Sequence, residues 1–179
     1  MKRTIEQAFQ ALQEQIRAWG RGEARPDLRV FVYPPEWEPV VLSRFPGFAG
    51  QCAKGDHPIV LEDVGQGFLR EVERRKGVVA RLSLLDQSEL LHDLGWIALS
   101  YLRRALTAPL EPPAVCRIFT NTGTLGTFVS YSAIANELSG GAADALVPAT
   151  VLAFPGEADD RSLNLLRLRV DTNYRVARI

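Results

Sequence analysis

The sequence predicts an α/β protein, with a mainly parallel sheet flanked by helices and with a C-terminal antiparallel hairpin. Three observations lead to this fold class. Short runs rich in β-branched and aromatic residues alternate with segments of helical periodicity. The apolar run at 147–154 has the length and composition of a buried strand. Near the C-terminus, apolar residues alternate with arginines, which is the period of a strand with one wet face.

The first third of the chain predicts one helix, one strand and a difficult segment. Apolar residues recur at three- and four-residue steps from Thr4 to Trp19, which is typical of an amphipathic helix. A strand is expected from Leu28 to Tyr33. Within residues 36–53, Pro39 and Pro46 interrupt a weak helical pattern. We expect a short helix that starts near Pro39, followed by irregular structure or a second helix.

The middle of the chain predicts a second strand and two helices. The strand is expected from Pro58 to Asp63, and Asp63 or the glycines after it begin a helix that ends at Gly77. Asp86 and Glu89 match an N-cap with its acidic third residue, a variant of the capping box. The apolar stripe that follows predicts the longest helix of the protein.

The last third predicts two further strands and a hairpin. Strands are expected at 115–120 and 147–154, with an amphipathic helical segment at 127–138 between them. Leu163 to Val170 is expected to be one strand, Asp171 to Asn173 a turn, and Tyr174 to Ile179 the returning strand.

Composition sets limits on the function. The 179 residues are near the usual size of one domain, and 21 basic residues balance 21 acidic ones, so no global field attracts nucleic acid or membranes. Cys52 and Cys116 are expected to be reduced and structural. The chain shows neither a signal peptide nor an apolar run of about 20 residues. We therefore expect a cytoplasmic protein.

The residues 154–179, FPGEADDRSLNLLRLRVDTNYRVARI, resemble a known family. They are similar to the C-terminal signature of the BrxB family of bacterial BREX phage-defence systems, with its proline-glycine turn, leucine-rich strand and Asp-x-Asn-Tyr hairpin. The resemblance implies a single BrxB-like domain over 1–179. It also implies association with the PglZ-like putative phosphatase, the large BrxC-like ATPase and the DNA methyltransferase of such a system. We expect a non-enzymatic adaptor or scaffold.

Arginines are concentrated in the same C-terminal segment. On shared strand faces they would form a ridge suited to carboxylates of a partner or to phosphates. The arginine bias of a GC-rich genome would explain the same residues, and packing within a hairpin is the favoured explanation of Tyr174. The candidate partner-binding residues are Arg161, Arg167, Arg169, Tyr174, Arg175 and Arg178.

A candidate phosphate loop follows the strand at 115–120. Asn121, Thr122, Gly123 and Thr124 leave an apolar strand and precede a helical segment, whose N-terminal amides would suit an anion. No lysine follows Lys76, so a complete P-loop is absent and a turn with hydroxyl caps is the simpler interpretation. The alternative function is a degenerate nucleotide-binding domain or weak NTP hydrolase.

Metal and catalytic patterns are incomplete in the sequence. Cys52 with His57 supplies too few zinc ligands, and Glu89 with His92 lacks the second copy that a di-iron bundle needs. We expect no metal, no cofactor and no catalytic residue. A third hypothesis, nucleic-acid binding through the arginine ridge, predicts an affinity that falls steeply with salt; the balanced charge leaves nucleic acid only an indirect partner.

Overall fold

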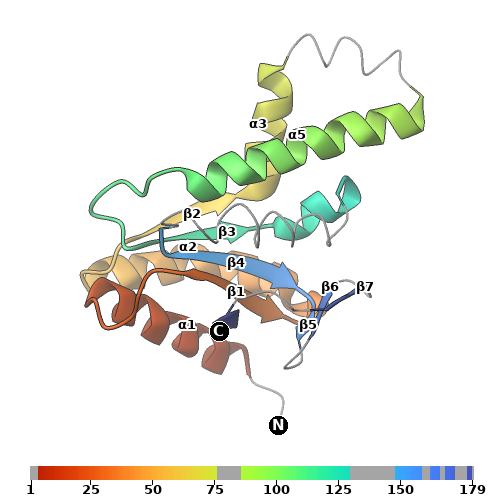
Figure 1. The fold of residues 1–179 in the computed structure, drawn as a ribbon. Coiled ribbons are helices and arrows are strands. Elements are labelled where there is room, and N and C mark those ends of the chain that lie inside the picture. Colours follow the sequence, from red (N-terminus) through yellow and green to blue (C-terminus); the bar gives the residue numbers. More distant parts are fainter. Residues whose placement is uncertain are drawn as a thin grey trace.

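The computed structural model describes residues 4–75, 86–129, 148–158, 162–165, 168–171 and 177–178, and beyond residue 156 the description concerns the backbone. This part of the chain has the predicted α/β fold (Figure 1). The main sheet is parallel throughout, with strand order β2-β3-β4-β1-β8. Its strands are β1 (Leu28–Tyr33), β2 (Ile59–Asp63), β3 (Cys116–Thr120), β4 (Thr150–Pro155) and β8 (Ala177–Arg178). Strand order was not readable from the sequence.

One face of the sheet is covered by α1 (Ile5–Gly20) and α2 (Glu38–Lys54), the latter preceded by the 3-10 helix η1 (Pro35–Trp37). The helix predicted from Thr4 to Trp19 is confirmed, with Thr4 as its N-cap. An aromatic cluster fills this layer: the ring of Phe9 lies 5.3–5.4 Å, centroid to centroid, from the rings of Phe31, Phe45 and Phe48. Edge-to-face geometry adds to the apolar burial.

The segment with two prolines forms one continuous helix, so the expected short helix with a break was wrong. Pro39 occupies the first turn, as predicted, but Pro46 lies inside α2. Pro46 removes one helical hydrogen bond, which costs about 3 kcal/mol. Val41, Phe45, Phe48 and Cys52 recur on one buried face, and burying the valine and each phenylalanine contributes about 1.5–3 kcal/mol per side chain. Packing therefore outweighs the proline.

The opposite face carries α3 (Val64–Arg74), α5 (Gln87–Thr107) and the 3-10 helix η2 (Thr122–Thr127). Asp63 caps α3, and Asp86 with Glu89 forms the predicted capping box of α5, the longest helix among the described residues. The apolar stripe of α5 packs on the sheet with α3 beside it (Figure 1). α3 ends at Arg74 with Arg75 as its C-cap, which is earlier than the predicted end at Gly77. Most of the segment 127–138 lies outside the described residues.

The C-terminal hairpin is present, but its residues differ from the prediction. A separate antiparallel sheet has the order β5 (Glu157–Ala158), β6 (Ser162–Leu165) and β7 (Leu168–Asp171). The predicted single strand is thus divided into two. The physical reason is that the alternation of apolar residues shifts by one residue between Leu165 and Leu168. The register sets Leu163 opposite Val170 and Leu165 opposite Leu168. Each pairing places apolar residues across from each other, which stabilises a hairpin.

The final strand also departs from the prediction. Instead of returning beside the leucine-rich segment, β8 pairs in parallel with β1, where Ala177 lies opposite Arg29 and Arg178 opposite Val30. Residues 172–176 and 179 of the predicted returning strand lie outside the described residues.

Within the described ranges, no helix combines the length and apolar character that a membrane span requires.

Candidate functional site

The carboxyl ends of the parallel strands meet at one edge of the main sheet, which we call the carboxyl edge. β1 ends at Tyr33, β2 at Asp63, β3 at Thr120 and β4 at Pro155. The chain leaves β1 into α2 on one face, and leaves β2 into α3 on the other. Ligands of open α/β sheets bind at this edge, where connections diverge to opposite faces. The carboxyl edge is therefore the candidate functional site.

The loop after β3 is fixed by its own side chains. Asn121 has a left-handed φ of 57°, a conformation that asparagine tolerates better than most residues. Thr124 Oγ1 donates a hydrogen bond to Asn121 Oδ1 at 3.0 Å, and Asn121 Nδ2 donates to Asp63 Oδ1 at 3.4 Å. The predicted candidate loop is thus tied to the end of β2.

Gly65 allows α3 to begin against this loop. Asp63 Oδ1 accepts a hydrogen bond from the backbone N of Gln66 at 2.9 Å, which confirms the helix-start interpretation of this glycine-containing segment. A Cβ atom at Gly65 would lie 3.0 Å from Asn121 Nδ2 and 3.3 Å from Thr124 Oγ1. Any side chain here would push the loop away from α3.

The groups around the loop do not favour an anion. Thr122 is buried and donates its hydroxyl to the carbonyl of Ala153, and the Thr124 hydroxyl is used within the loop. Gly123 lies against Pro155. The Asp63 carboxylate beside Asn121 would repel a phosphate. The residues form a 3-10 turn, but its N-cap Asn121 makes no side-chain capping hydrogen bond and the two threonine hydroxyls donate elsewhere, so the expected hydroxyl caps are not seen. Phosphate binding by these four residues stays a prediction.

Tyr33 and Glu38 add a second polar pair to the carboxyl edge. Tyr33 is 1% exposed, and its hydroxyl makes no hydrogen bond of normal geometry. Burial raises the pKa of the Tyr33 phenol, and the negative charge of Glu38 raises it further. Partial burial also raises the pKa of the Glu38 carboxyl. Glu38 Oε1 is 3.8 Å from the Cβ position of Gly123, so this pair lies next to the loop.

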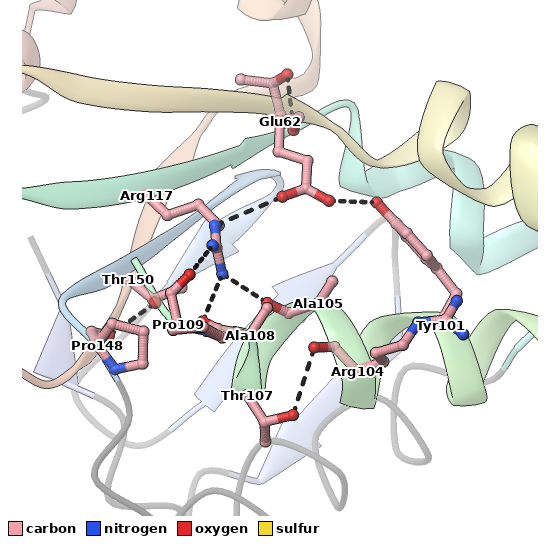
Figure 2. A network of polar contacts seen from close by, with 11 residues as sticks. Glu62, Tyr101, Arg104, Ala105, Thr107, Ala108, Pro109, Arg117, Pro148 and Thr150 are labelled. Carbon is pink, nitrogen blue, oxygen red and sulfur yellow. Dashed lines mark hydrogen bonds and ion pairs between the residues drawn. The ribbon is translucent and has the colours of Figure 1, made fainter. Parts of the chain in front are cut away.

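A larger polar network lies between the sheet and α5, away from the loop (Figure 2). The Arg117 side chain, on β3, is 9% exposed and pairs with the Glu62 carboxylate at 3.5 Å between Nε and Oε2. Tyr101 on α5 donates its hydroxyl to Glu62 Oε1 at 3.0 Å. Burial raises the pKa of the Tyr101 phenol, and Glu62 adds to this effect.

Arg117 also holds the C-terminal end of α5. Its guanidinium donates to the carbonyls of Ala105 at 2.7 Å, Ala108 at 3.2 Å and Pro109 at 3.0 Å (Figure 2). Carbonyls at a helix C-terminus lack intrahelical partners, and a cation there is favourable. The network thus has an architectural role. One feature of the sequence could have indicated this network, namely a single arginine, Arg117, inside the apolar run VCRIFT. Arg117 was not among the candidate residues predicted from the sequence.

The predicted arginine ridge is divided by the strand pairing. Arg169 lies on β7 opposite Asn164, whereas Arg178 lies on β8 in the main sheet, opposite Val30. A ridge across one hairpin that contains both is therefore wrong. Arg161, Arg167, Tyr174 and Arg175 lie outside the described residues.

The candidate metal pairs have other surroundings in the structure. Cys52 is a buried free thiol at the end of α2, as is Cys116 in β3. His57 packs on Gly20, where a Cβ atom would lie 2.5 Å from its Nδ1. In the described ranges, no group of three or more His, Cys, Asp or Glu side chains is placed to hold a metal ion.

Comparisons with protein-family models, with curated proteins and with solved structures found no match to this chain.

Proposed function

We propose that this chain is a non-enzymatic component of a BREX-type anti-phage defence system, and that it acts in the cytoplasm as an adaptor or scaffold. The observation that carries the proposal is the resemblance of residues 154–179 to the BrxB C-terminal signature. The proposed partners are the PglZ-like protein, the BrxC-like ATPase and the methyltransferase.

The arrangement of the C-terminal segment supports a binding role. Its first part forms the separate sheet β5-β6-β7, while β8 extends the edge of the main sheet beside β1. Figure 1 places the small sheet beyond the carboxyl ends of β1 and β4. A small sheet at the periphery of the parallel sheet offers strands and side chains to another protein, as in recognition by strand addition.

The polar groups of the carboxyl edge support binding rather than catalysis. Asn121 hydrogen-bonds to both Asp63 and Thr124, and Asp63 also caps α3. A general base or nucleophile must instead reach the atom on which it acts. These side chains are used to fix the loop.

Co-purification with the products of neighbouring genes tests the proposal. Tagged wild-type protein is expected to retain the PglZ-like or the BrxC-like protein through size exclusion with light scattering. A variant with Arg167→Glu and Arg169→Glu is expected to lose that complex, because carboxylates would repel an acidic partner surface. The matched control reverses Arg21 and Arg25, two exposed residues after α1, to Glu and is expected to retain the complex.

The proposal fails if the wild-type protein remains alone with each neighbour. Calorimetric titration with ATP then tests the nucleotide-binding alternative. Specific ATP binding that is lost on Asn121→Ala would favour that alternative, and binding to nucleic acid that weakens steeply with salt would favour the nucleic-acid hypothesis.

A further inference from the structure

We draw no further inference here: the strongest candidate, the surface patch on α5 where Trp96 is 60% exposed and the guanidinium of Arg75 lies 4.7 Å from its ring centroid, carries no proposal because nothing among the described residues shows what covers it.

Discussion

The two faces of the main sheet are held by different physics. Under α1 and α2, four phenylalanine rings including Phe9 pack against one another, and neither of the buried charged side chains among the described residues lies in this layer. Under α3 and α5, apolar packing is joined by buried charge: Glu71 is 5% exposed and Arg117 is 7% exposed. Apolar burial stabilises the fold but does not require one particular orientation of the side chains. Paired charges require a defined geometry, and the stability that they contribute changes with pH. The α1/α2 face is therefore held by apolar packing, and on the α3/α5 face the charged pairs also fix the positions of the helices.

Removing a ring from the aromatic face is expected to have the largest effect. Phe45 is 1% exposed and contacts Phe9, Phe31 and Phe48. Phe45→Ala should lower the free energy of unfolding by about 3–5 kcal/mol, because it leaves a cavity in a packed layer. Urea denaturation followed by circular dichroism measures this loss. Val40→Ala, at an exposed position of the same helix, is the control, and an equal loss there would contradict the contrast.

Breaking the polar network on the other face is expected to have a smaller effect. Arg117→Leu leaves the carbonyls of Ala105 and Ala108 and the Glu62 carboxylate without their cation. The loss in unfolding free energy should be about 1.5–3 kcal/mol, the usual range for hydrogen bonds to a charged group. In this variant, the rate of amide hydrogen exchange should increase more in the last turns of α5 than in α2. Uniformly faster exchange in both helices would mean that Arg117 does not act on α5 in particular.

A pH-dependent effect at Glu71 is the smallest of the three. Burial acts to raise the pKa of the Glu71 carboxyl, but the guanidiniums of Arg104 and Arg75 outweigh it and hold that pKa below the ordinary value of 4.5. A carboxyl with a lowered pKa stabilises the fold at pH above its unfolded value, and that stability is lost as the pH falls through the folded value. The Arg104 side chain is 56% exposed, so solvent screening limits the contribution to about 1 kcal/mol.

Urea unfolding of the wild type and of Glu71→Gln, from neutral pH into the acid range, measures this effect. The stability difference between the two proteins should be full at neutral pH and should shrink as the pH drops below about 4. The aromatic-face variant Phe45→Ala is the comparison, because its deficit should change much less over the same range. A difference at Glu71 that is constant with pH would contradict the assignment.

Local sequence signals predicted most of the fold. The amphipathic pattern of α1, the apolar run of β1 and the caps at Asp63 and Asp86 were readable because each depends on residues close in sequence. The continuity of α2 was not readable, because burial against the sheet overrides the local effect of Pro46. The division of the predicted strand between Leu165 and Leu168 was not readable either, because it depends on the pairing of β6 with β7 across the hairpin.

The candidate site was less accessible from the sequence. The loop at Asn121 was identified because it follows a strand, but its ties to Asp63 depend on strands β2 and β3 being neighbours. The partnership of Arg117 with α5 likewise comes from tertiary contacts.

The position of β1 in the sheet has a consequence for how this protein is made. β1 ends at Tyr33, yet the two strands that flank it, β4 and β8, begin at Thr150 and Ala177. During synthesis, the hydrogen-bonding groups of β1 therefore emerge from the ribosome long before either of their partners. Pairings so distant in sequence make folding slow and leave strand edges open to wrong associations. A nascent chain that stops short of β4 should bind chaperones through β1, and release should follow completion of the sheet.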